Sequence, residues 1–169
     1  MPKLTETEVA DFLDEPGHLA RIASIDGDGF PRVVPLWFIR DGGRVLFTPR
    51  SEAVLWSNVQ RDERIAISID EDDLPYRKVA LQAHCEVVHP PGEDDEWRDL
   101  YRSIAKRYTP PDAADAYVDG TDDQPRPLCA VDLGDRRTRL STWRMPVSGE
   151  DPRGVWARRY FRPGTKWAH

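Results

Sequence analysis

The stretch from Phe30 to Asn58 constrains the fold of this chain more than any other. Arg32 to Arg40 is rich in β-branched and aromatic residues, which favour a strand, and Arg44 to Thr48 can form the returning strand. Between them, Asp41-Gly42-Gly43 supplies residues that tolerate the positive φ angles of a hairpin turn. From Ser51 onward the apolar residues follow at helical spacing, and we expect Ser51 to cap that helix. The stretch therefore predicts a hairpin that leads through a polar corner into a helix.

The corner itself, Thr48-Pro49-Arg50-Ser51, offers chemistry that suits a phosphate group. Two hydroxyls, a guanidinium and the unpaired backbone N–H groups of a helix start all favour an anion. The simpler interpretation is a capped turn with a surface arginine, since serine is a common N-cap residue. The residues alone leave both interpretations open.

Further elements follow from periodicity and terminal signals along the chain. Thr5 and Glu8 form a capping box at the start of a helix over Leu4 to Asp14. The strand over Arg64 to Asp70 alternates cleanly, so its isoleucines are expected to face inward. The other expected elements are strands over His18 to Ile25 and Arg77 to His89, helices over Asp94 to Tyr108 and Asp112 to Val118, and a last hairpin of Pro127 to Leu133 with Thr138 to Met145. In the strand over Arg77 to His89, one apolar face is expected to comprise Val79, Leu81, Ala83, Cys85 and Val87.

The strand that begins at Arg32 is apolar on both faces. Such a strand has to be covered twice, by its own core and by a helix or a second subunit. Pro35 lacks a donor for the hydrogen-bond ladder, so we expect it at a sheet edge or bulge that a ligand or partner can approach.

This order of elements predicts a mostly β (α+β) fold, a closed or partly split antiparallel barrel with helices packed outside. At 169 residues the chain is expected to form one domain over residues 1–169. Residues 146–169 are rich in proline and glycine and are expected to form an extension laid on a neighbouring subunit.

Charge and composition exclude several classes of function. A net charge of −6 argues against broad electrostatic binding of nucleic acid. No apolar run is long enough to cross a bilayer, and the N-terminus shows no signal region, so we expect a cytoplasmic protein. Cys85 and Cys129 are expected to be buried thiols, with a disulfide or metal pair as the lesser alternative. The histidines lack zinc-site spacing, so no metal is expected.

Three segments resemble the pyridoxamine 5′-phosphate oxidase-like superfamily, the FMN-binding split barrels. They are HLARIASIDGDGFPRVVPLWF at 18–38, RVLFTPRSEAVLWSNVQRDERIAISID at 44–70 and LPYRKVALQAHCEVV at 74–88, with a looser match in STWRMP at 141–146. The resemblance implies a homodimer with two identical sites at the subunit interface. Each site would hold FMN or a 5-deazaflavin coenzyme, with haem as the less favoured alternative, and transfer hydride or electrons to a small substrate.

The resemblance also implies which residues form that site. The cofactor-binding positions it points to are Arg32, Val33, Val34 and Pro35 beside the ring, Phe47, Thr48, Arg50 and Ser51 at the phosphate end, Lys78 and Gln82 on the adjacent strand, and the late pair Trp143 and Arg144. The substrate is expected near Trp37, Trp156 and Tyr160. No side chain is assigned as a catalytic acid or base, because the cofactor supplies the chemistry.

One position departs from the family pattern. A basic residue commonly stands three positions before Asn58, and this chain has Leu55 there. Arg50 would have to take over the phosphate. The alternative hypothesis is a non-catalytic barrel that binds or carries a flavin, deazaflavin or haem, or one that has lost its cofactor.

Overall fold

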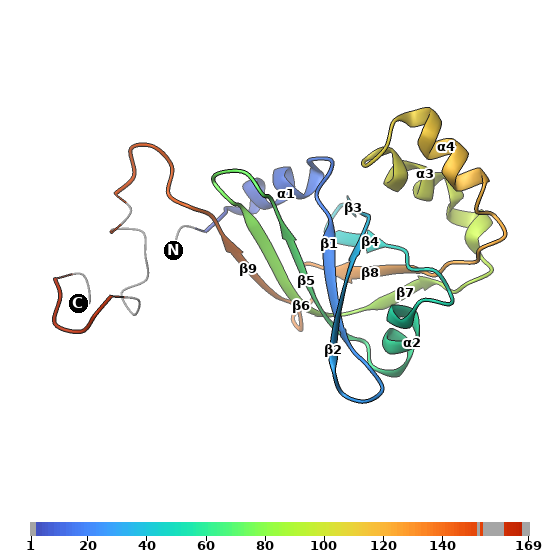
Figure 1. Ribbon diagram of the computed structural model, residues 1–169, viewed down its shortest axis with the longest axis horizontal. Helices are drawn as coiled ribbons and strands as arrows, with labels where there is room; N and C mark the ends of the chain where they lie inside the picture. Colours follow the sequence, from blue (N-terminus) through green and yellow to red (C-terminus); the bar gives the residue numbers. More distant parts are fainter. Residues whose placement is uncertain (1–2, 152, 154–160, 167–169) are drawn as a thin grey trace.

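The computed structural model describes residues 3–151, 153 and 161–166, and its strands form two antiparallel sheets (Figure 1). The five-stranded sheet has the order β2-β1-β5-β6-β9, and the four-stranded sheet has the order β3-β4-β8-β7. The strands are β1 (Ala20–Ile25), β2 (Pro31–Leu36), β3 (Phe38–Asp41), β4 (Arg44–Phe47), β5 (Arg64–Asp70), β6 (Lys78–His84), β7 (Glu86–His89), β8 (Leu128–Asp132) and β9 (Arg139–Trp143). The predicted mostly β fold of the split-barrel type is confirmed.

The main core lies between the two sheets. In β5 the alternation is as predicted, with Ile65, Ile67 and Ile69 buried and the residues between them half-buried. These side chains meet Phe38 and Phe47 of the four-stranded sheet, both fully buried. The turn between β3 and β4 also matches the prediction, with Gly42 at φ 55°.

Helices cover this core at two places (Figure 1). Helix α1 (Glu6–Asp14) begins with the predicted Thr5–Glu8 capping box, and α2 (Val54–Arg61) packs on the same core. Helices α3 (Arg98–Lys106), preceded by a 3-10 turn (Asp94–Trp97), and α4 (Pro111–Asp119) pack on the four-stranded sheet and form a second core with it. Within the described ranges, the helices are all too short to cross a membrane.

Two strands that we expected to be continuous are broken and change sheets. The run from Arg32 to Arg40 is interrupted at Trp37, so that β2 and β3 join different sheets. The run from Arg77 to His89 breaks at Cys85 in the same way, into β6 and β7. The break also turns Val87 outward, to 41% exposure, against the prediction that it faces the core. Each long apolar run therefore contributes to both sheets.

The expected last hairpin is wrong. β8 pairs with β4 and β7, whereas β9 pairs with β6 in the other sheet. The turn at Gly134-Asp135 carries the chain between the sheets instead of folding it back on itself. After β9, residues 144–151 leave the sheets (Figure 1).

Ser51 does not cap α2. Its backbone N–H donates to the Pro125 carbonyl at 3.0 Å, and Ala53 donates to the Arg50 carbonyl at 3.0 Å. These bonds form a turn before the helix, so the N-cap is Ala53 and the helix begins at Val54. The two cysteines are free and buried as predicted.

Candidate functional site

The outward row of β2 runs past three hollows of the surface. Pro31, Val33 and Pro35 share one face of this edge strand, because side chains alternate along a strand. Pro31 lines a hollow of about 590 Å³, Val33 one of about 580 Å³, and Pro35 a smaller pocket of about 220 Å³. The predicted edge position of Pro35 is confirmed. One strand therefore connects all three hollows.

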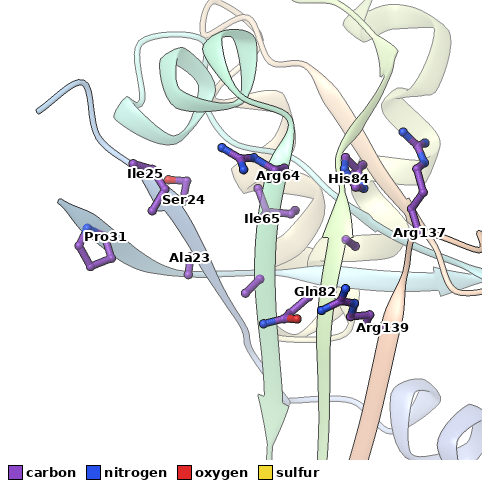
Figure 2. A pocket seen from close by; sticks show the side chains of 12 residues that line it. Ala23, Ser24, Ile25, Pro31, Arg64, Ile65, Gln82, His84, Arg137 and Arg139 are labelled. Carbon is purple, nitrogen blue, oxygen red and sulfur yellow. The ribbon is translucent and has the colours of Figure 1, made fainter. Parts of the chain in front are cut away.

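The two larger hollows adjoin each other over the five-stranded sheet and share Ala23, Ala66, Gln82 and Arg139. Figure 2 shows the first hollow, with Gln82 and Arg139 next to each other on the paired strands β6 and β9. Its remaining wall consists of Ser24, Ile25, Pro31, Arg64, Ile65, Ala83, His84 and Arg137. Arg64 is paired with Asp62 at 2.6 Å and Arg137 with Asp135 at 2.9 Å, which reduces their attraction for another anion.

The smaller pocket, hereafter the corner pocket, lies where β2, β4 and the α3–α4 pair meet. It is lined by Pro35, Leu36, Trp37, Thr48, Tyr101, Tyr117 and Arg126. It therefore brings together three predicted site residues, Pro35, Trp37 and Thr48. Arg50 lies near enough to the pocket to act on the pKa of Tyr117.

Arg126 supplies the positive charge inside the corner pocket. It is 6% exposed, and its guanidinium lies 4.8 Å from the centre of the Tyr101 ring. Its Nη2 donates to the Tyr117 hydroxyl at 3.3 Å and its Nη1 to the Thr48 carbonyl at 3.5 Å, while Nε has no hydrogen-bond partner in the part of the chain that the structure describes. Both bonds are long for a guanidinium donor.

The two tyrosines of the pocket have shifted pKa values. Burial raises the pKa of Tyr101, and the hydrogen bond with Tyr117 raises it further. Burial acts to raise the pKa of Tyr117 too, but the hydrogen bond from Tyr101 and the charges of Arg126 and Arg50 outweigh it and lower the pKa. The anionic form of Tyr117 is thus favoured by the positive charges beside it, whereas burial disfavours the anionic form of Tyr101.

The remaining residues of the predicted phosphate end lie at different depths. Arg50 is exposed, Ser51 is half-buried, and Phe47 is fully buried in the main core. Leu55 is 2% exposed and packs in the same core. A basic side chain at position 55 would therefore need a different packing of α2.

Arg32 lies apart from the corner pocket. In the β1–β2 register it stands opposite Ser24, on the face away from Val33, and it pairs with Asp26 at 2.7 Å. The Arg32 guanidinium holds the pKa of Asp26 below its usual range, with a further contribution from Asn58. Val34, on the same face, packs against the main core.

The other predicted positions are spread over the five-stranded sheet. Lys78 stands opposite Trp143 in the β6–β9 register, on the face that also carries Gln82. Arg144 lies in a separate hollow beside α1 and pairs with Glu150 at 2.8 Å. Trp156 and Tyr160 lie outside the described residues.

Our sequence interpretation missed the residues that give the corner pocket its charge. Tyr101 was assigned to the apolar stripe of a helix, and Arg126, between two prolines, showed no pattern at all. Their juxtaposition with Thr48 depends on contacts between residues 78 positions apart. Only the aromatic content of the helical segments hinted at a ring-lined pocket.

The comparisons with known proteins agree with this architecture. A family model described as pyridoxamine 5′-phosphate oxidase matches residues 5–135. The conserved hypothetical protein Rv2991 from Mycobacterium tuberculosis is 25% identical, with a TM-score of 0.62 over 82% of this chain and 84% of that chain. A structure titled F420 reductase is 25% identical, with a TM-score of 0.56 over 78% of this chain and 94% of that chain.

A more distant neighbour shares the fold alone. The haem storage protein HutZ from Vibrio cholerae is 16% identical, with a TM-score of 0.58 over 80% of this chain and 94% of that chain. No curated protein matches the chain.

Proposed function

This chain belongs to the pyridoxamine 5′-phosphate oxidase family, and we propose that it is a flavin- or deazaflavin-dependent oxidoreductase acting on a small organic substrate. The observation that carries the proposal is the family match over residues 5–135. The 25% identity to an F420 reductase, over nearly the whole of that protein, supports a deazaflavin as strongly as FMN.

The residues at the corner fit the phosphate end of such a coenzyme. Thr48 and Ser51 provide hydroxyls, Arg50 is exposed beside Tyr117, and Arg126 is a buried cation with an unused donor. These are groups that bind a phosphate well. Arg32 is engaged by Asp26, so we assign it no more than a supporting role at the ring.

The size of the corner pocket argues that the ring lies elsewhere. A volume of about 220 Å³ is below the range of roughly 300–1,000 Å³ that cofactor pockets occupy. The outward row of β2 leads from this pocket to the larger hollows, so we place the ring along Val33 and Pro35, with Gln82 on the adjoining face. As an edge strand, β2 offers unpaired backbone groups to the ring.

The bound coenzyme would supply the hydride or electron chemistry, and the chain would bind and orient it. Arg50, Thr48 and Ser51 would fix one end, and the apolar row of β2 would hold the flat part away from water. Trp37, stacked on Tyr108 at 5.2 Å, would form a rigid wall on the substrate side. We propose no acid or base among the described side chains.

We further propose that the site is completed by a second copy of the chain. Val33 is 61% exposed and Ile25 is 41% exposed on the outward face of β1 and β2, and the two large hollows are open to solvent. A second five-stranded sheet laid on this face would cover the apolar residues and enclose the ring. Lys78, Trp143, Arg144 and the segment with Trp156 and Tyr160 are proposed to contribute near that interface.

A titration of the purified protein with FMN and with a 5-deazaflavin coenzyme, followed by visible absorbance and fluorescence, tests the proposal. We expect saturable binding of one of them, reduction of the bound coenzyme, and reoxidation by a substrate. Arg50→Ala should weaken coenzyme binding by roughly 1.5–3 kcal/mol if Arg50 makes a charge-assisted contact with the phosphate. Arg136→Ala, another exposed arginine, is the matched control. Failure of both coenzymes to bind would refute the proposal.

The second candidate is a carrier that binds the coenzyme or haem without turnover. The buried Leu55, where family members commonly carry a basic residue, favours this candidate. Tight binding of a flavin with no electron transfer, or a Soret band after addition of haem, would support the carrier over the enzyme.

A further inference from the structure

Arg126 is a buried cation without a counter-ion. Within the described residues no carboxylate pairs with its guanidinium, and its two side-chain hydrogen bonds go to neutral oxygens at 3.3 and 3.5 Å. Arg107 gives the contrast: its Nε also has no partner among the described residues, but its Nη groups donate to the carbonyls of Leu13, Asp14 and Glu15 at 2.7 to 3.0 Å. Leaving a charge buried with few partners destabilises the folded state. Arg126 is thus poorly satisfied by the protein itself.

The unsatisfied donor lies beside a cavity. Arg126 lines the corner pocket, whose volume of about 220 Å³ is ample for a phosphate or carboxylate group. A guanidinium has five N–H donors in a planar fork, and two of those of Arg126 have acceptors among the described residues. Such a fork matches two oxygens of one anion.

Neighbouring groups make the pocket more positive. The Tyr117 oxygen accepts from Arg126, and the charges of Arg126 and Arg50 both act to lower the pKa of the Tyr117 phenol. Two guanidinium groups therefore converge on a single phenol at the pocket wall. Asp94 accepts the backbone N–H of Arg126 at 2.6 Å, and within the described part of the chain no ion pair joins it to the Arg126 side chain.

The walls restrict what else can enter. Trp37 packs edge-on against Tyr117, with ring centres 5.4 Å apart, and Pro35 of β2 also lines the pocket. The pocket lining thus combines three aromatic rings with one guanidinium. This combination suits the acidic end of a molecule whose body extends over Pro35.

We propose that Arg126 binds an oxyanion, the phosphate or carboxylate end of a ligand, in the corner pocket. The group comes either from the coenzyme or from a small acidic substrate, and the proposal holds whether or not the protein is a redox enzyme. Arg126 is thereby assigned a ligand-binding role that no feature of the sequence indicated.

The first experiment uses inorganic phosphate and benzoate as probes. We expect either anion to raise the melting temperature of the wild-type protein above that in chloride of equal ionic strength, by binding to the folded state. Arg126→Met should abolish that rise while leaving the melting temperature without anion unchanged or higher, because a buried unpaired charge is removed. The exposed Arg136→Gln should behave as the wild type.

A structural arginine would give the opposite pattern. If Arg126→Met melts at a lower temperature and the wild type responds to neither anion, the pocket holds water and the proposal is wrong. An equal response of Arg126→Met and wild type would place the anion elsewhere and also refute it. If Arg126→Met does not fold, Arg126→Lys keeps the charge without the fork and should weaken anion binding roughly tenfold.

The second experiment identifies the source of the anion with FMN and riboflavin, which differ by the phosphate alone. If Arg126→Met weakens FMN binding by roughly 10- to 100-fold and spares riboflavin, the coenzyme phosphate occupies the pocket. If it changes neither but abolishes the benzoate response, the pocket takes an acidic substrate. If neither coenzyme binds while phosphate still stabilises the wild type through Arg126, the redox proposal fails and the anion site stands.

Discussion

The outer faces of the two sheets differ in how far they are covered. The four-stranded sheet is covered by α3 and α4, and its outer residues Leu46, Leu128 and Ala130 are buried in the second core. The outer face of the five-stranded sheet carries Val33 at 61% exposure and two open hollows.

The difference shows which sheet face is covered by the chain's own helices and which face is left exposed for a partner or ligand. Helices that follow β7 in sequence return over one sheet, which is thereby sealed. The other sheet is left with apolar and polar residues side by side, as at surfaces that bind a partner or ligand. The corner pocket lies at the boundary, and its walls come from the end of β2, Thr48 after β4, the helical pair and Arg126 before β8.

The largest expected effect is on the free energy of unfolding, from a substitution in the four-stranded sheet under α3 and α4. Leu46 is 4% exposed, so Leu46→Ala should lower the free energy of unfolding by about 2–5 kcal/mol through lost contacts and a cavity. Leu140, which lines the second open hollow and is 42% exposed, is the matched leucine. Leu140→Ala should change the unfolding free energy of the monomer by about 0.5 kcal/mol or less. Urea unfolding of both variants measures the contrast, and equal losses would contradict it.

A substitution on the exposed face of the five-stranded sheet should instead change the self-association of the protein. If a second copy covers β2, Val33→Glu buries an unpaired carboxylate and should weaken the dimer by about 2–3 kcal/mol, roughly 30- to 150-fold. Sedimentation over a concentration series gives the dissociation constant. Val87→Glu, on the edge strand β7 of the other sheet and 41% exposed, is the control. A wild type that stays monomeric at high concentration would refute the proposed dimer.

Acid should lower the free energy of unfolding through the ion pairs that attach the open sheet to α1. Arg77 pairs with Glu71, which is 9% exposed, at 2.6 Å and with Glu15 at 2.7 Å. Burial acts to raise the pKa of Glu71, but hydrogen bonds from Arg77 outweigh it, and the pKa values of both Glu71 and Glu15 are lowered. Their contribution is therefore present at neutral pH and is lost as the pH falls below about 5, where the unfolded carboxylates begin to bind protons.

Arg77→Met tests this attachment. It should lower the free energy of unfolding at pH 7 by about 1–3 kcal/mol, between the values for exposed and buried ion pairs. The free energy of unfolding of the variant should also decrease less than that of the wild type between pH 7 and pH 3. Arg98→Met, whose partner Asp95 is 94% exposed, should leave the pH profile unchanged. Parallel pH profiles for Arg77→Met and wild type would show that other carboxylates dominate.

The smallest effect belongs to a surface pair on the sealed sheet. Arg44 of β4 and Glu86 of β7 lie 3.2 Å apart, and Glu86 is 63% exposed. Glu86→Gln should change the unfolding free energy by about 0–1 kcal/mol, and less in high salt. Thermal unfolding at two salt concentrations is sufficient, and a loss above 2 kcal/mol would mean that the pair is buried by a partner.

Much of the fold could be predicted from the sequence because local patterns determine it. The Thr5–Glu8 capping box, the alternation of Ile65 to Ile69 and the turn at Gly42 each depend on a few adjacent residues. The breaks at Trp37 and Cys85 could not be predicted, since apolar residues on both sides of a strand look the same whether it stays in one sheet or changes sheets. The false last hairpin has the same origin, because a turn does not show which sheet receives the next strand.

The candidate site was predictable only in part, for a similar reason. Pro35, Trp37 and Thr48 lie in the segment that carries the family resemblance, and they share the corner pocket. Arg126 reaches that pocket through pairing of β8 with β4, a contact that no spacing along the chain reveals. Arg144 was grouped with the site by resemblance, yet it lies beside α1 and pairs with Glu150.

The strand breaks at Trp37 and Cys85 have a consequence for how the molecule comes apart. At each break a single residue separates a strand of one sheet from a strand of the other. Opening of one sheet therefore disturbs the strand pairing of the other sheet. The two sheets are thereby linked into one cooperative unit, and the slowest-exchanging amide protons of both should report the same opening free energy.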